Sequence, residues 1–236
     1  MLTTRQCKHQ VLTLLAQADW EAQLPEVMAL PTQKVVGALF GALHHTDTAL
    51  KWHAVTAFGL VVADLAATAP EKARIIMRRF IWNLNEESGG IGWGSAEAMA
   101  EIMAQSPLLA KEYHNHLLAY IHEDQCRHDC YLEYAPLRRG AIWGIGRLSL
   151  VRPDLTRRAE PDLLRALSDC DARIQALAAW TCGILQLESA APMLEKLLTN
   201  TISLDLYTNR REIQTTVGTL AREALFALSQ HPQATT

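Results

Sequence analysis

PDLLRALSD at Pro161–Asp169 and PMLEKLLTN at Pro192–Asn200 follow one pattern, and the second copy begins 31 positions after the first. In each copy proline comes first, leucine third, small or apolar residues sixth and seventh, and Asp or Asn last. A repeated unit of this length cannot bury its own apolar face, so it must stack on a neighbouring copy. The two segments therefore predict a repeat protein.

The apolar residues of the remaining chain indicate helices. They recur at three- and four-residue spacing almost throughout, and no run alternates convincingly as a strand would. Gly and Pro fall between these periodic segments, where helix breakers belong. Helices are predicted over residues 5–18, 33–44, 48–67, 71–84, 95–105, 108–123, 137–150, 155–167, 172–185, 190–198 and 213–229.

Small residues recur in the first helix of each predicted repeat. Small side chains allow the backbones of neighbouring helices to approach closely when ridges pack into grooves. We therefore expect close helix–helix contacts at three sets of positions: Ala54, Ala57 and Gly59; Ala141, Gly144 and Gly146; Ala176, Ala179 and Gly183.

The composition is that of a globular protein and argues against nucleic acid as a partner. A chain of 236 residues with 49% hydrophobic and 20% charged residues can bury a large core in one domain or one stack. Its formal net charge is −3 and its pI is near 6.3. Proteins that grip phosphates nonspecifically usually carry a basic excess, which this chain lacks.

The sequence predicts a cytoplasmic protein with no membrane partner. The first ten residues lack the charged-then-apolar layout of a secretory signal. The longest candidate for a membrane span, residues 54–67, is interrupted by Asp64 and is shorter than the roughly 18 residues that a span needs. The five cysteines are an odd number, and Cys170 and Cys182 lie in helical contexts, so we expect reduced thiols.

DCDARIQALAAW at Asp169–Trp180, followed by LESAAPMLEKLL at Leu187–Leu198, resembles the HEAT-like repeat of phycobilisome-lyase type. The resemblance is good over residues 136–200 and weaker over 47–123, and the N-terminal 45 residues match no repeat. It implies an all-α fold, an α-solenoid or armadillo/HEAT-like superhelix of stacked antiparallel helix pairs. The expected organisation is a single domain over residues 1–236, with a helical cap (1–46), HEAT-like repeats (47–200), and a loop and closing helix (201–236).

A glycine-rich loop, WNLNEESGGIGWG at Trp82–Gly94, is the most unusual connection between predicted helices. Its glycines permit close backbone approach, while Glu86 and Glu87 add charge. It follows a helix, lacks the Lys-Ser/Thr of a phosphate-binding loop, and would repel phosphate through its carboxylates. Two interpretations remain open: a turn whose tryptophans pack into the stack, or a binding loop.

Tryptophans beside polar residues recur near the start of successive first helices. If they share one face, that face offers aromatic anchors rimmed by charge, as protein-binding patches do. Burial of these tryptophans in the core is the alternative. The predicted contact set consists of Trp52, Glu86, Glu87, Trp93, Glu97, Arg139 and Trp143.

Histidines and cysteines cluster between residues 114 and 130. Zinc takes such nitrogen and sulfur ligands tetrahedrally. The spacing matches no zinc finger, however, and surface polar residues on a helix end and loop are the favoured interpretation. The weak metal candidates are His122, Cys126, His128 and Cys130.

The sequence favours a non-catalytic scaffold that binds another protein through its concave face. No catalytic residue and no cofactor is assigned, since no Ser/His/Asp or Cys/His arrangement is recognisable. The resemblance allows two alternatives, because a minority of such repeat proteins are bilin-lyase subunits or DNA-repair enzymes. These are a subunit of a bilin-lyase-like modifying enzyme and, less favoured, a HEAT-like DNA glycosylase.

Overall fold

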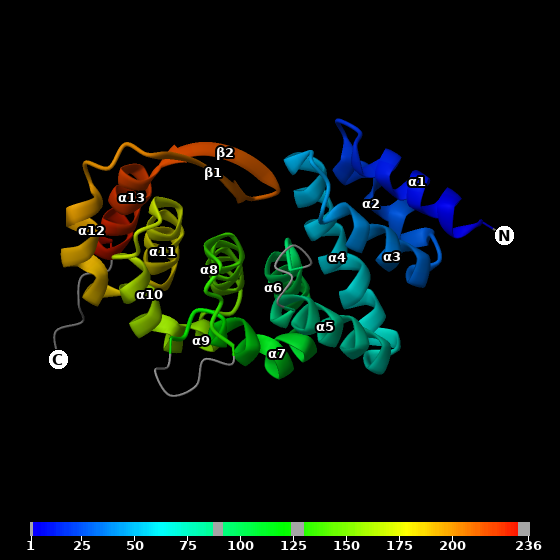
Figure 1. Ribbon diagram of the computed structural model, residues 1–236, viewed down its shortest axis with the longest axis horizontal. Helices are drawn as coiled ribbons and strands as arrows, with labels where there is room; N and C mark the ends of the chain where they lie inside the picture. Colours follow the sequence, from blue (N-terminus) through cyan, green and yellow to red (C-terminus); the bar gives the residue numbers. More distant parts are fainter. Residues whose placement is uncertain (1, 87–91, 124–129, 231–236) are drawn as a thin grey trace. The chain divides into compact units, whose positions relative to one another are not determined.

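The computed structural model describes residues 2–86, 92–123 and 130–230. Its contacts gather into two compact units, Met1–Tyr113 (unit 1) and His114–Thr236 (unit 2). Helices make up most of each unit, and Figure 1 shows their order along the chain. The division falls inside the predicted repeat array of residues 47–200, so the single domain stays a prediction.

Unit 1 is built around one long helix. Its helices are α1 (Thr4–Leu15), α2 (Trp20–Ala29), α3 (Thr32–Ala42), α4 (Thr48–Thr68), α5 (Pro70–Asn85), α6 (Ser95–Gln105) and the first part of α7 (Pro107–Ala119). α4 packs against α3, α5 and α6. Three rings from α3, α4 and α5 meet in the core, with Phe40–Phe58, Phe40–Phe80 and Phe58–Phe80 centroids 5.0, 4.7 and 5.1 Å apart. These edge and tilted contacts fix the spacing of the three helices.

α4 is long and apolar enough to cross a membrane by length and composition alone. Its contacts with three neighbouring helices give another reason for that composition. Phe58 and Val62 are fully buried within unit 1. A core helix surrounded by other helices is expected to be apolar on most of its circumference.

Unit 2 contains a row of three helices backed by shorter ones. α11 (Ala172–Leu185) packs between α8 (Ala135–Ser149) and α13 (Val217–Ser229), as Figure 1 shows. The remaining segments are the end of α7, α9 (Pro153–Thr156), α10 (Glu160–Ala166), α12 (Ala191–Leu197), two 3₁₀ turns (Arg157–Ala159 and Glu188–Ala190), and strands β1 (Ser203–Thr208) and β2 (Arg211–Thr216). α10 packs on α11 and α12 packs on α13, which gives the layered arrangement expected of stacked repeats.

Glycines predicted at close helix contacts do lie there. A Cβ atom added to Gly59 would lie 2.6 Å from Glu101 Cγ, and one added to Gly146 would lie 2.3 Å from the Trp180 ring. At Gly183 the added atom would lie 2.8 Å from the Cα of Ala224. The helices therefore touch at distances that only glycine permits.

Asp171 joins two successive layers of unit 2. Its Oδ1 atom accepts hydrogen bonds from the backbone N–H groups of Arg173 and Ile174 and so caps α11. Its Oδ2 atom accepts from Arg139 Nε on α8, 2.9 Å away, and from the same guanidinium through Nη2. Burial raises the pKa of the Asp171 carboxyl, but these hydrogen bonds outweigh it and the pKa lies below its ordinary value.

Asp171→Asn should lower the free energy of unfolding by about 1–2 kcal/mol at pH 7, because the amide still caps α11 but loses the ionic contact with Arg139. A carboxylate whose pKa is lower in the folded than in the unfolded state stabilises the folded state at pH values above the unfolded pKa. That stabilisation disappears as the pH falls through the folded pKa. The wild-type and Asn curves should therefore converge once the pH has fallen below the depressed pKa of Asp171. Urea unfolding at several pH values measures this. The exposed Asp154→Asn is the control, and a difference that persists unchanged at pH 2 would exclude the ion pair as its source.

The C-terminal connection differs from the prediction. Residues 201–216 were expected to be a loop followed by the start of a helix at residue 213, but Ser203–Thr208 and Arg211–Thr216 pair as an antiparallel hairpin. Leu204 and Leu206 alternate with exposed residues, as a half-buried strand requires. Asn209 and Arg210 both have positive φ, 49° and 61°, which matches a two-residue type I′ turn.

Two helical segments also differ. α2 was not predicted, and it contains Pro25 in its interior, where proline normally disrupts a helix. Burial of Trp20, Leu24 and Val27 stabilises the helix nonetheless. The helix predicted over residues 155–167 is divided into α9, a 3₁₀ turn and α10.

Candidate functional site

In unit 1, the first turns of α4 and α6 meet at Lys51. The Lys51 Nζ atom lies 3.1 Å from Glu97 Oε1, and its distance from the centre of the Trp52 ring is 5.2 Å. The side chains of Lys51 and Glu97 are 24% and 9% exposed. A carboxylate this buried needs its cation, because removing the partner leaves an uncompensated charge.

The approach of the chain to α6 depends on Gly94. This residue is the N-cap of α6 and has a φ of 75°, in the left-handed region that favours glycine. A Cβ atom there would lie 3.0 Å from Leu43 Cδ2 and 3.3 Å from Lys51 Cε. The sequence Trp93-Gly94 therefore brings the backbone against Lys51 and leaves the Trp93 side chain 48% exposed.

Lys51, Trp52, Trp93 and Glu97 together form what we call the Lys51 surface. Trp52 is half-buried with its ring near the Lys51 ammonium, and the exposed Trp93 directly precedes Gly94, which packs against Lys51. Large aromatic side chains with few rotatable bonds contribute much of the energy at protein interfaces. The geometry suits contact with an apolar side chain flanked by a polar group.

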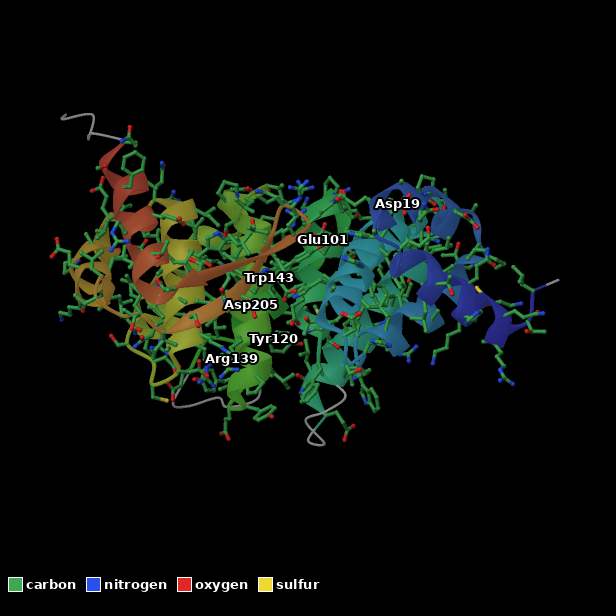
Figure 2. The ribbon with its side chains drawn as sticks, turned by 90° about the horizontal axis from the view of Figure 1, so that it is seen from above. Asp19, Glu101, Tyr120, Arg139, Trp143 and Asp205 are labelled. Atoms are coloured by element: carbon green, nitrogen blue, oxygen red, sulfur yellow. The ribbon has the colours of Figure 1, made fainter. Side chains whose placement is uncertain are left out.

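Glu101 lies one turn further along α6, labelled in Figure 2, and is 5% exposed. It accepts a hydrogen bond from Gln105 Nε2 at 3.0 Å and packs against α4 at Gly59. The carboxylate is held within the α4–α6 contact. The Glu101 side chain is therefore part of the α4–α6 contact in unit 1.

The predicted contact set divides between the two units. Trp52, Glu86, Trp93 and Glu97 belong to unit 1, and three of these form the Lys51 surface. Glu86 is the half-buried C-cap residue of α5, and Glu87 lies outside the described residues. Arg139 and Trp143 belong to unit 2. That the members other than Trp143 share one concave face stays a prediction.

Trp143 is buried, with 3% of its surface exposed. Its indole Nε1–H donates to the backbone carbonyl of Tyr207 at 2.8 Å, where the hairpin crosses α8 (Figure 2). The prediction that Trp143 belongs to an exposed contact surface is wrong for this reason. The residue anchors β1 to the repeat.

Arginines at the start of α8 are engaged by carboxylates. Arg138 donates to Asp169 Oδ2 at 3.1 Å and to the backbone carbonyls of Leu132 and Glu133, while Arg139 binds Asp171. Each guanidinium thus faces an acidic partner within unit 2. Charge neutralisation of this kind weakens the case for a phosphate-binding stripe.

The His/Cys cluster is only partly described. His122 Nδ1 lies 3.1 Å from both carboxylate oxygens of Asp162, and Cys130 is exposed. Cys126 and His128 lie outside the described residues. Within residues 2–86, 92–123 and 130–230, no group of three or more His, Cys, Asp or Glu side chains is placed to hold a metal ion.

One residue of the Lys51 surface was missed by the predicted contact set. Lys51 links Trp52 to Glu97, and the signal for it was its position directly before Trp52 at the start of a helix. Trp82, which is 59% exposed on α5, lies outside the Lys51 surface as defined.

Residues 135–185 match the family described as HEAT-like repeat. The protein carries a HEAT-like repeat. The matched segment runs from the start of α8 to the end of α11, so this HEAT-like repeat contains Arg139, Trp143 and Asp171. None of the curated proteins matches the chain.

Two solved structures share the fold. A designed armadillo repeat protein, YIII(Dq)4CqI, is 16% identical, covers 93% of this chain and 98% of its own, and gives a TM-score of 0.50. An engineered protein is also 16% identical, covers 94% of this chain and 96% of its own, and gives a TM-score of 0.50. At this identity the similarity concerns the fold alone, which is mostly helical and of the armadillo/HEAT solenoid type, with the β1–β2 hairpin as an addition. Repeat folds of this type are typical of protein-interaction scaffolds.

Proposed function

We propose that this protein is a non-catalytic scaffold that binds another protein through the Lys51 surface of unit 1. The observation that carries the proposal is that Trp93 is exposed and directly precedes Gly94, which packs against Lys51 of the Lys51–Glu97 ion pair. A large apolar ring that the fold does not need for its own core is available to a partner. The repeat fold supports the same kind of function.

The Lys51 surface is also held in place before a partner arrives. Lys51 is fixed by Glu97, and Gly94 fixes the backbone next to Trp93. Ordering side chains at an interface costs free energy, so a surface that is already ordered binds more tightly. The partner that fits presents an apolar side chain to Trp93 next to a hydrogen-bonding group.

Cysteine chemistry supports a cytoplasmic location, which is part of this proposal. The four described cysteines, Cys7, Cys130, Cys170 and Cys182, are free thiols. Burial, with a smaller contribution from Glu160, raises the pKa of Cys182 to about 12. A protein that keeps its thiols reduced suits a reducing compartment.

Affinity capture from the native cell, followed by quantitative mass spectrometry, tests the scaffold function. The baits are the wild-type protein, Trp93→Ala, and Trp82→Ala as a matched exposed tryptophan of the same unit. We expect one partner to be retained by wild type and Trp82→Ala and to be reduced about tenfold or more with Trp93→Ala. Equal recovery with all three baits would rule out the Lys51 surface as the binding site.

A further inference from the structure

The β1–β2 hairpin of unit 2 has one edge that is engaged and one that is free. Hydrogen-bonded and non-hydrogen-bonded pairs alternate along an antiparallel ladder. The Val217 N–H donates to the Ile202 carbonyl at 3.1 Å, which marks one hydrogen-bonded pair just beyond the strands. Every second pair of the register after Ile202–Val217 is therefore hydrogen-bonded. These pairs are Leu204–Thr215, Leu206–Ile213 and Thr208–Arg211.

The intervening residues direct their backbone groups outward. On β1 these include Tyr207, and its carbonyl accepts from Trp143 Nε1, which confirms the alternation and shows that the β1 edge is engaged. On β2 the outward residues are Thr216, at the end of the strand, and the two exposed residues Glu212 and Gln214. Within residues 130–230, no hydrogen bond from outside the hairpin reaches the backbone of either residue. An edge with unpaired donors and acceptors is a template for another strand.

The hairpin is rigidly attached, so this edge is formed in advance. Leu204, Leu206 and Tyr207 are buried, whereas the side chains of residues 211–214 are exposed. At the other end of β2, Thr216 caps α13 by accepting from the Thr219 N–H at 3.1 Å. Strand addition to a fixed edge does not have to organise the edge first.

We infer that the free edge of β2 binds an extended peptide segment of a partner protein by antiparallel strand addition. In this mode backbone hydrogen bonds supply affinity and alternate side chains supply specificity. The site lies in unit 2 and is independent of the Lys51 surface. A second copy of this chain is the less favourable occupant, because a six-residue edge buries far less than the about 1,600 Å² of a stable interface.

Side chains of β2 indicate the sequence of the segment. Arg211 and Glu212 are exposed, lie on opposite faces of the strand, and make no ion pair with described residues. A partner residue opposite Arg211 should be acidic, and one opposite Glu212 should be basic. Ile213 is 44% exposed and favours a β-branched residue opposite it. Read from its N-terminus, the segment facing Thr215 to Arg211 is Thr-Thr-Val-Lys-Glu.

The probe is the capped peptide acetyl-Thr-Thr-Val-Lys-Glu-amide, titrated to about 2 mM into the full chain labelled with ¹⁵N. We expect the amide signals of Glu212 and Gln214 to shift and to gain protection from hydrogen exchange. The charge-exchanged peptide Thr-Thr-Val-Glu-Lys should bind several-fold more weakly. Absence of shifts at β2 up to 2 mM, or shifts confined to other elements, would overturn the inference.

Gln214→Pro is the decisive variant, because it removes an outward N–H that the hairpin ladder does not use. It should raise the dissociation constant of the peptide about tenfold or more. The Trp143 indole N–H signal should show that the hairpin of this variant still contacts α8. Ile213→Lys leaves every ladder hydrogen bond in place and should give a similar loss, so it serves if proline disturbs the hairpin. Strand addition is contradicted if Ile213→Lys binds the peptide as tightly as wild type does, and if Gln214→Pro also does so while its hairpin still contacts α8. A concentration-dependent dimer in sedimentation, abolished by Gln214→Pro, would assign the edge to a second copy and overturn the peptide proposal.

Discussion

Trp143→Ala is expected to lower the free energy of unfolding of unit 2 by about 3–5 kcal/mol, the cost of truncating a large buried aromatic side chain. Trp143 is 3% exposed, so the substitution leaves a cavity between α8 and the hairpin. It also leaves the Tyr207 carbonyl without its indole donor. Both losses destabilise the same contact, and the hairpin should detach before the helices unfold.

Urea unfolding followed by far-ultraviolet circular dichroism measures this loss. Trp143→Phe separates the two contributions, since it keeps an aromatic ring but removes the N–H donor, and it should cost about 1–3 kcal/mol. Phe226→Ala, at a side chain that is 65% exposed in the same unit, should change stability by less than about 0.5 kcal/mol. A loss below about 1 kcal/mol for Trp143→Ala would mean that the indole is not part of the core.

Gly183→Ala should lower the free energy of unfolding of unit 2 by about 2–3 kcal/mol, although alanine is the better helix former. The added methyl group would lie 2.8 Å from the Cα of Ala224, so α11 and α13 must move apart. Backbone atoms in two packed helices cannot yield as the end of a flexible side chain does. The same unfolding measurement detects the effect.

Gly37→Ala is the matched control for that substitution. Gly37 is an exposed residue inside α3, and an added Cβ atom meets nothing within 4 Å. Only helix propensity changes at this position, so the free energy of unfolding of Gly37→Ala should rise by about 0.5–1 kcal/mol. If both glycine variants were stabilised, the close packing of α11 on α13 would be wrong.

Sequence periodicity was enough to predict the helical stack. The helices predicted over residues 95–105 and 172–185 coincide with α6 and α11. Small residues identified the closest helix contacts because glycine at a packed interface leaves a plain signal, as at Gly146 and Gly183. Local sequence therefore determines most of the architecture.

Failures of prediction arose where distant residues decide the outcome. The sequence of the hairpin predicts a loop, because Leu204 and Leu206 are its only pair of alternating buried residues. Trp143 is buried by Tyr207, 64 positions later, so no local pattern could separate it from the exposed Trp93. The Lys51 surface was partly found, because Trp52 and Glu97 were selected, but the lysine that joins them was not.

Binding through the Lys51 surface is tested most directly by calorimetric titration of the captured partner into wild type and Trp93→Ala. We predict a dissociation constant at least about tenfold weaker for Trp93→Ala, with the free energy of unfolding changed by less than about 0.5 kcal/mol. Trp82→Ala should bind as wild type does. An unchanged dissociation constant for Trp93→Ala, or a loss of stability above about 2 kcal/mol, would contradict the assignment of this tryptophan to a partner rather than to the core.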